Sequence, residues 1–211
     1  MISCVQRRDT ERVRTLAQLA SVNVHPVVIE SPCNPAGGPL NRHAALMALK
    51  RADFDGVLFV EDDIDVNQRL FTAFVDMAVE ARELTTFCVM RDALYPPGVY
   101  DSLTPRLVHL QGTSARRGFY GTQCVYIPGW LVSKIIASHR DFEDQQGQPL
   151  KDCHGFDFWL KENVTTILAA FPNPVQHRQP PKMARVTRGE PGVQTQHYSR
   201  SFDLGVQHET A

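Results

Sequence analysis

The sequence predicts an α/β fold, in which a mostly parallel central sheet carries helices on both faces. Two features of the 211 residues support this prediction. Short apolar runs with strand chemistry alternate with longer segments in which apolar residues recur every three or four positions. The apolar run at 56–60 also ends abruptly in carboxylates, and ligands of open α/β sheets bind where such strands end. With 43% hydrophobic residues, a chain of this length can bury a full core.

The first ninety residues supply most of the alternation. We expect strands there at 2–6, 27–30, 56–60 and 86–90. The helices expected between and after these strands span 9–20, 41–51 and 71–81. The inward side of the first helix is predicted to hold Val13, Leu16, Ala17 and Ala20. Strands that are joined through helices in this way favour parallel pairing.

The second half of the chain is less regular. Residues 91–119 contain Pro and Gly and no clear period, so we expect an irregular excursion or a short antiparallel hairpin. The remaining predicted elements are a strand at 123–127, helices at 130–139 and 156–162, and a final strand at 165–170.

Composition excludes several classes of protein. The formal net charge of -1 argues against a dedicated, strongly cationic nucleic-acid binder. The five cysteines form no C-x-x-C pair and are odd in number, so we expect reduced, mostly buried thiols and no disulfide framework or zinc knuckle. No apolar run approaches the roughly 20 residues that span a bilayer, which predicts a cytoplasmic protein without a membrane span.

The acidic cluster that follows the strand at 56–60 is the main functional signal. It contains Glu61, Asp62, Asp63 and Asp65. In an extended segment residues i and i+2 point the same way, so Asp63 and Asp65 would present two carboxylates on one face. Oxygen ligands of this kind favour Mg²⁺, Mn²⁺ or Ca²⁺ over zinc and leave positions for a substrate phosphate. The alternative is a plain acidic turn, in which Asp65 caps a helix that begins near Asn67.

The chain from Pro172 onward is basic and rich in Pro, Gly and Gln. Its basic residues are His177, Arg178, Lys182, Arg185, Arg188, His197 and Arg200. This segment is either a solvated tail or a flap whose cations cover a diphosphate.

Four motifs in this order resemble glycosyltransferases of the GT-A type. They are VEDDID, GTQCVYIPGWLVSKII, GFDFWL and FPNPVQHR. The resemblance is to the lipooligosaccharide-type family 25 enzymes and their small bacterial and phage relatives. It implies a GT-A-like (Rossmann-like) catalytic domain over 1–175 and a basic C-terminal tail or flap over 176–211. It also implies a nucleotide-diphosphate-sugar donor, Mn²⁺ or Mg²⁺ as the cofactor, and transfer with inversion.

The resemblance also suggests roles for the acidic cluster. Asp63 and Asp65 match the metal-binding D-x-D positions, Asp62 would face the donor ribose or orient its neighbours, and Glu61 would lie outside the metal ligands. His177 resembles the C-terminal histidine that often completes the metal site. The competing histidines are His197 and, with weaker claims, His154 and His43.

The base and the donor contacts come from other segments. Asp157 in HGFDFWL matches the acid that accepts the proton of the acceptor hydroxyl, with Asp152 as the runner-up. A simple helix cap is the alternative for Asp157. Gln6 and Arg8 after the first strand, and Arg42 at the head of a predicted helix, would hold the nucleotide.

The acceptor stays open between a saccharide and a hydroxylated or modified DNA base. Two other functions compete with the glycosyltransferase. A nucleotidyltransferase would normally show an N-terminal glycine-rich phosphate loop, and ISCVQRRDTER contains no glycine. A non-enzymatic Ca²⁺- or Mn²⁺-binding module is opposed by the missing EF-hand pattern and by the strand and helix alternation.

Overall fold

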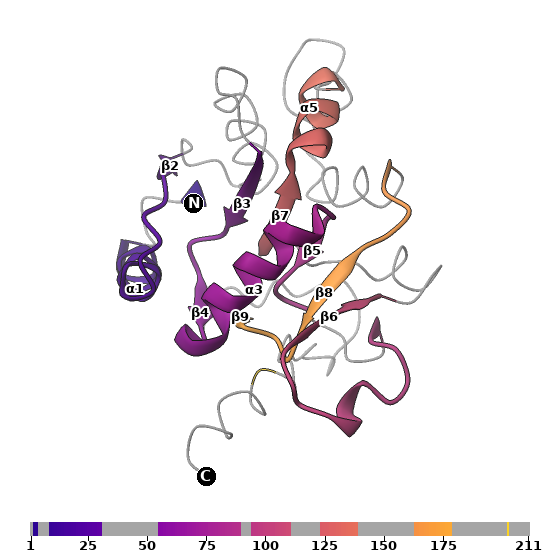
Figure 1. Ribbon diagram of the computed structural model, residues 1–211. Helices are drawn as coiled ribbons and strands as arrows, with labels where there is room; N and C mark the ends of the chain where they lie inside the picture. Colours follow the sequence, from indigo (N-terminus) through magenta and orange to yellow (C-terminus); the bar gives the residue numbers. More distant parts are fainter. Residues whose placement is uncertain are drawn as a thin grey trace, which may run out of the picture.

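The computed structural model describes residues 2–3, 9–30, 55–89, 94–110, 123–138, 163–178 and 202 (Figure 1). Several residues singled out in the sequence lie outside these ranges. They are the nucleotide-binding candidates Gln6, Arg8 and Arg42, the base candidates Asp152 and Asp157, and the histidines His43, His154 and His197. Predictions that concern them remain predictions.

A five-stranded sheet forms the centre of the described fold, with its strands in the order β3-β7-β5-β8-β6 (Figure 1). Its strands are β3 (Gly56–Val60), β5 (Thr85–Thr86), β6 (Arg106–His109), β7 (Cys124–Pro128) and β8 (Leu168–Phe171). Four of them fall at or near the strands expected from the sequence. β6 lies in the irregular stretch, where it follows the short 3₁₀ helix η2 (Val99–Asp101) and forms an edge of the sheet.

The prediction of an α/β fold is confirmed, but the mostly parallel sheet is wrong for the described strands. β7 pairs antiparallel with both β3 and β5, and β6 pairs antiparallel with β8. Only β5 and β8 among these strands are parallel neighbours. The error has a topological cause, because β7 returns after a long excursion and inserts between β3 and β5. Local periodicity identifies a strand but not the place or direction in which it joins a sheet.

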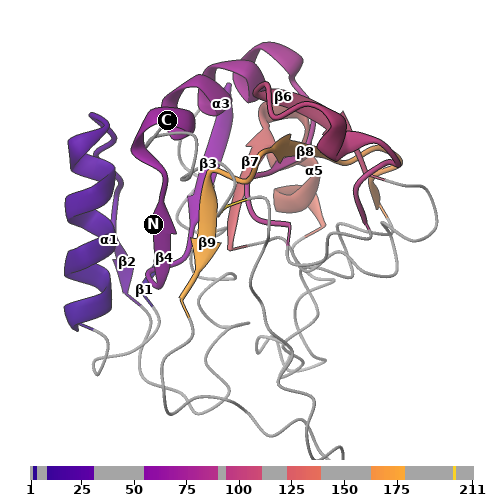
Figure 2. The same cartoon turned by 90° about the horizontal axis from the view of Figure 1, so that it is seen from below.

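Helices lie on both faces of this sheet, as predicted. Helix α3 (Gln68–Ala81) covers one face and α5 (Gly129–Ala137) the other, as Figure 2 shows. Alternation along the strands divides the core accordingly. Phe59 and Ile127 belong to the cluster that contains the buried α5 side chains, whereas Val60 and Tyr126 belong to the cluster that contains those of α3. β3 and β7 are therefore apolar on both sides.

Helix α1 (Asp9–Ser21) lies beside two small sheets (Figure 2). β1 (Ile2–Ser3) pairs in parallel with β2 (Ile29–Glu30), and β4 (Ile64–Val66) pairs antiparallel with β9 (Val175–His177). The predicted inward face of α1 is wrong except at Leu16, which is partly buried against the core. Thr15 and Leu19 are fully buried, while Val13 is 61% exposed. The apolar pattern missed this rotation because the inner face of α1 uses the Thr15 hydroxyl to bind backbone carbonyls of the acidic turn.

Helix α3 begins at a polar cap other than the one considered in the sequence. The side-chain oxygen of Asn67 accepts hydrogen bonds from the amides of Arg69 and Leu70, at 3.2 and 3.3 Å. Asn67 is thus the N-cap, and Asp65 does not have this role. Among the helices that the structure describes, none is long and apolar enough to cross a membrane.

Candidate metal centre

The acidic turn connects β3 to β4 across the edge of the central sheet. The amide of Glu61 donates to the carbonyl of Gln123 at 2.8 Å, which extends the pairing of β3 with β7 by one residue. The chain then bends at residues 62–63 and re-enters a strand at Ile64, which pairs with His177 of β9. The turn and the end of β9 therefore face each other.

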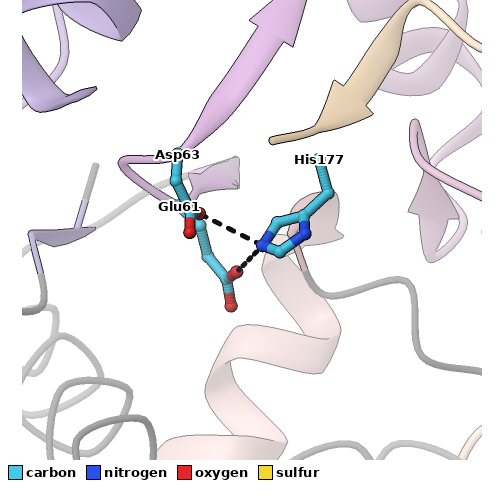
Figure 3. A group of neighbouring side chains, drawn as sticks. All are labelled: Glu61, Asp63 and His177. Carbon is cyan, nitrogen blue, oxygen red and sulfur yellow. Dashed lines mark ion pairs between the residues drawn. The ribbon is translucent and has the colours of Figure 1, made fainter. Parts of the chain in front are cut away.

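Glu61, Asp63 and His177 converge at this point, as Figure 3 shows. The Nε2 atom of His177 lies 3.3 Å from Oδ1 of Asp63 and 3.9 Å from Oε2 of Glu61. Each of the three side chains offers one ligand atom, and these atoms all lie within 4.8 Å of one another. Of the predicted metal ligands, the structure brings Asp63 and His177 together and adds Glu61.

The 3.3 Å spacing between His177 and Asp63 fits ligands of one divalent cation, and the 3.9 Å spacing between His177 and Glu61 would have to shorten for Glu61 to join them at an ordinary angle. Ligand atoms bound at about 2.1 Å lie about 3.0 Å apart at right angles and about 3.4 Å apart at a tetrahedral angle. Two neighbouring carboxylates repel each other unless a positive charge lies between or beside them. The side chain of Asp63 is 4% exposed, but those of Glu61 and His177 are 18% and 20% exposed. A cation held here would be reached from the side of Glu61 and His177.

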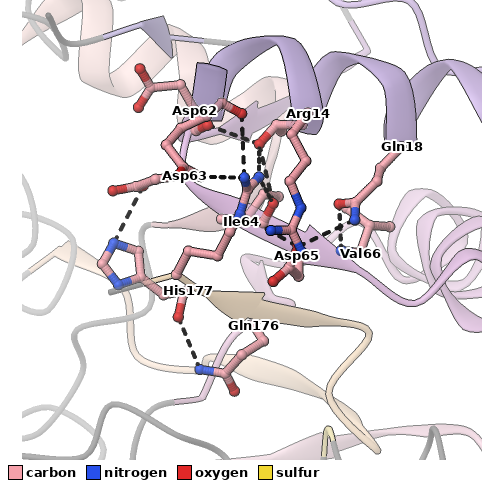
Figure 4. Close-up of polar contacts among 12 residues, drawn as sticks. Arg14, Gln18, Asp62, Asp63, Ile64, Asp65, Val66, Gln176 and His177 are labelled. Atoms are coloured by element: carbon pink, nitrogen blue, oxygen red, sulfur yellow. Dashed lines mark hydrogen bonds and ion pairs between the residues drawn. The ribbon is translucent and has the colours of Figure 1, made fainter. Parts of the chain in front are cut away.

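Asp65 lies apart from this group of three. Its Oδ1 atom is 2.7 Å from Nη2 of Arg14 and accepts a hydrogen bond from Nε2 of Gln18 at 3.2 Å. Figure 4 shows Arg14 and Gln18 reaching from α1 to the segment at Asp65 and Val66. The i, i+2 expectation required one continuous strand through Asp63 and Asp65. Asp63 is instead at a bend and Asp65 in the new strand β4, so Glu61 takes the place assigned to Asp65.

Two other expectations for this region do not match the structure. Asp62 is fully buried, which does not match a carboxylate that faces the ribose of a donor and leaves the alternative, that it orients its neighbours. Arg178 was grouped with tail cations that cover a diphosphate. Its side chain is only 10% exposed, and its guanidinium contacts the carboxylates of Glu11 and Asp65. Arg178 therefore belongs to the framework of the turn.

The side-chain amide of Asn173 is buried and fixes the segment that leads into β9. The side-chain oxygen of Asn173 accepts hydrogen bonds from the Val89 amide at 3.2 Å and the Tyr95 hydroxyl at 2.5 Å. Its side-chain nitrogen donates to the Val89 carbonyl at 3.0 Å. Asn173 thus pairs with Val89 much as a neighbouring strand would. The sequence feature that could have identified Asn173 is its place in FPNPVQHR, between a predicted strand and His177.

Two free cysteines, Cys88 and Cys124, are buried near the candidate centre. Burial raises the pKa of the Cys88 thiol to about 12. A backbone hydrogen bond from His177 opposes this rise in the pKa, and the negative charges of Glu61 and Asp63 add to it. Burial also raises the pKa of Cys124. Both side chains therefore remain neutral thiols at physiological pH, as the sequence predicted for reduced, buried cysteines.

Comparison with known proteins adds no functional assignment. No protein-family model and no curated protein sequence matches the chain. Among solved structures the chain is similar to A197 from STIV, with a TM-score of 0.49 and 14% sequence identity. That similarity covers 85% of this chain and 84% of the other.

Proposed function

We propose that the chain is a divalent-cation-dependent glycosyltransferase with a GT-A-like fold. The observation that carries the proposal is the convergence of Glu61, Asp63 and His177 on one point, from two segments more than a hundred residues apart. The order of the sequence motifs supports the transferase part of the proposal. The sugar would come from a nucleotide-diphosphate donor and pass with inversion to a hydroxyl of a saccharide or of a modified DNA base.

Among Mg²⁺, Ca²⁺ and Mn²⁺, the cations that the sequence suggests, the set of ligand atoms favours Mn²⁺. Two carboxylates suit Mg²⁺, Ca²⁺ and Mn²⁺, whereas an imidazole suits transition metals. Mn²⁺ satisfies both preferences, so we expect it to bind more tightly than Mg²⁺ or Ca²⁺. The imidazole of His177 also argues against a Ca²⁺-binding module, because Ca²⁺ sites in proteins are built from oxygen ligands.

The residues would divide the work as follows. Glu61, Asp63 and His177 hold the cation, which when bound supplies positive charge to the leaving nucleoside diphosphate. Partial exposure of Glu61 and His177 leaves the donor an approach to the site. Asp157 remains the proposed base for the acceptor hydroxyl, and Gln6, Arg8 and Arg42 remain proposed donor contacts; all four lie outside the described residues.

Metal binding is the first test. We would titrate Mn²⁺, Mg²⁺, Ca²⁺ and Zn²⁺ into the chain by calorimetry, with His177→Ala and Asp63→Asn as site variants. Asp76→Asn removes the same charge from an exposed position on α3 and serves as the control. We expect Mn²⁺ binding by the wild type and the control, and its loss in both site variants. Equal Mn²⁺ binding by wild type and His177→Ala would refute the centre.

Donor binding is the second test. A panel of UDP-, GDP-, CMP- and TDP-sugars would be titrated with Mn²⁺ and again with EDTA. We expect one donor to bind only with Mn²⁺. Asp157→Asn should keep that binding and lose transfer of the sugar, because a base acts on the acceptor and not on the donor. If Mn²⁺ binds but no donor does, the transferase part of the proposal fails while the metal centre stands.

A further inference from the structure

We infer that Thr15 and Arg178 are positioning residues, which fix the acidic turn in the one shape that aims Asp63 at His177. This inference rests on the proposed function, since it concerns the same metal centre. Neither residue contacts the ligand atoms of the centre in any of the contacts that the structure gives for them. Both act through the backbone of the turn.

The turn is held at three consecutive carbonyl oxygens. The Thr15 hydroxyl lies 2.8 Å from the carbonyl oxygen of Asp62 and 3.1 Å from that of Ile64, and donates between them. The amide of Arg178 donates to the carbonyl of Asp63 at 2.7 Å. The Arg178 guanidinium donates to the carbonyl of Ile64 as well. A peptide plane whose carbonyl is hydrogen-bonded cannot rotate freely. The peptide planes before and after Asp63 are both held in this way, so the direction of its side chain is fixed.

Thr15 and Arg178 also orient each other. Nη2 of Arg178 donates to Oγ1 of Thr15, which directs the threonine proton toward the carbonyls of the turn. The charge of Arg178 is balanced by Glu11 of α1 and by Asp65 of β4. Thr15 itself is fully buried. Helix α1 is thereby attached to both segments that supply the three candidate ligands.

Arg178 has a second link to the centre through its position in the chain. It directly follows His177, whose register partner in β4 is Ile64. The amide hydrogen bond of Arg178 to Asp63 therefore extends the pairing of β4 with β9 to the residue beyond the histidine, and its guanidinium adds a side-chain bond to Ile64. Loss of these bonds would free the end of β9 and hence the imidazole. Partners that hydrogen-bond directly to metal ligands typically change metal affinity by about 10- to 100-fold when they are removed, and we expect the lower end of that range for residues that act through the backbone.

Two matched pairs of variants test the inference. Thr15→Val keeps the shape of the side chain and removes the hydroxyl, while Thr15→Ser keeps the hydroxyl. Arg178→Met removes a guanidinium that binds the turn, while Arg14→Met removes one that pairs with Asp65 from a side chain that is 57% exposed. Leu131→Ala, in fully buried α5 packing, controls for lost stability alone.

The measurement is the dissociation constant for Mn²⁺, followed by the electron paramagnetic resonance signal of free Mn²⁺. Each variant is measured at a temperature where near-ultraviolet circular dichroism shows it folded. We expect Thr15→Val and Arg178→Met to weaken binding at least tenfold, and Thr15→Ser and Arg14→Met by less than threefold. Leu131→Ala should lose stability and keep its affinity.

The outcomes separate the two proposals. If wild type and Thr15→Val bind Mn²⁺ equally, positioning is refuted and the centre stands. The same holds if Leu131→Ala weakens binding as much as Thr15→Val does. If the wild type does not bind Mn²⁺, both proposals are overturned. Should Arg178→Met fail to fold, the Thr15 pair alone decides, because serine and valine differ there in the hydroxyl under test.

Discussion

Replacement of Asn173 by alanine should destabilise the protein more than its small change in volume suggests. Asn173 is fully buried and Val89 is 2% exposed, so water cannot replace the lost partners. The substitution leaves the Val89 amide and carbonyl without the bonds at 3.2 and 3.0 Å. Each buried backbone group left unsatisfied costs about 1–3 kcal/mol, partly offset because the asparagine amide no longer has to be desolvated.

We expect a loss of about 3 kcal/mol in the free energy of unfolding, from these two groups together. For a chain of this size that is a fall of roughly 6–12 °C in Tm. The assay is equilibrium unfolding in urea, followed by fluorescence and by circular dichroism to check that the transition is two-state.

Tyr95→Phe is the matched control, because it removes a hydroxyl from the same network but leaves both Asn173 bonds to Val89. It should cost only about 1 kcal/mol, the typical net worth of a hydrogen bond. Equal losses for Asn173→Ala and Tyr95→Phe would refute the reasoning. So would a loss below about 1 kcal/mol for Asn173→Ala, since the pairing with Val89 would then contribute nothing special.

Three further predictions follow from the structure. Gly56→Ala should cost about 1–3 kcal/mol in urea unfolding, because its Cβ would lie 2.4 Å from the hydroxyl oxygen of Tyr126, and the cost should shrink in a Tyr126→Leu background. The raised pKa of Cys88 should make the free energy of unfolding fall between pH 9 and about 12, because the thiol of the unfolded chain ionises at a lower pH than that of the folded chain. Measured in EDTA, the decrease per pH unit in this range should be smaller by about 1.4 kcal/mol in Cys88→Ala than in the wild type. Mn²⁺ at a hundredfold excess over its Kd should stabilise the wild type by about 2.7 kcal/mol in thermal unfolding, and His177→Ala should remove this effect.

Each of these three has an outcome that contradicts it. Gly56→Ala with wild-type stability would mean that Tyr126 moves aside at no cost. Parallel stability curves for wild type and Cys88→Ala across the alkaline range would mean that the native thiol ionises as readily as the unfolded one. Equal stabilisation of wild type and His177→Ala by Mn²⁺ would locate the cation elsewhere.

Local patterns in the sequence predicted most of the described elements. α3 is a clear case, because Phe71, Phe74, Val75 and Ala78 recur at helical spacing; three of them are buried, and Val75 is partly buried against the same cluster. α1 was found at the right position but on the wrong face, because its buried Thr15 serves hydrogen bonding that an apolar pattern cannot reveal. Strand directions were missed for a different reason. The place where β7 inserts depends on contacts between distant residues, which no local period encodes.

The candidate site was predictable in part for similar reasons. Asp63 and His177 were marked by their residue types and their motifs, and the structure brings them together. Glu61 lies in the group of candidate ligands where we expected Asp65, because a bend at residues 62–63 breaks the alternation of an extended strand. No local feature of the sequence predicts that bend. It follows from the pairing of β4 with β9, which lies more than a hundred residues further along the chain.

The hydrogen bond between Arg178 and Ile64 joins residues 114 positions apart in the sequence. This separation affects when the candidate site forms during folding and how it opens. Closing a loop of that length costs roughly 4 kcal/mol in chain entropy before any contact repays it. We therefore expect the candidate centre to take shape late in folding, after the sheet between its two halves has formed. β9 is three residues long, so its separation from β4 is the least costly way to break the centre. We therefore expect fraying of this short strand to open the candidate centre, and the amide of Arg178 is the hydrogen-exchange probe that would report it.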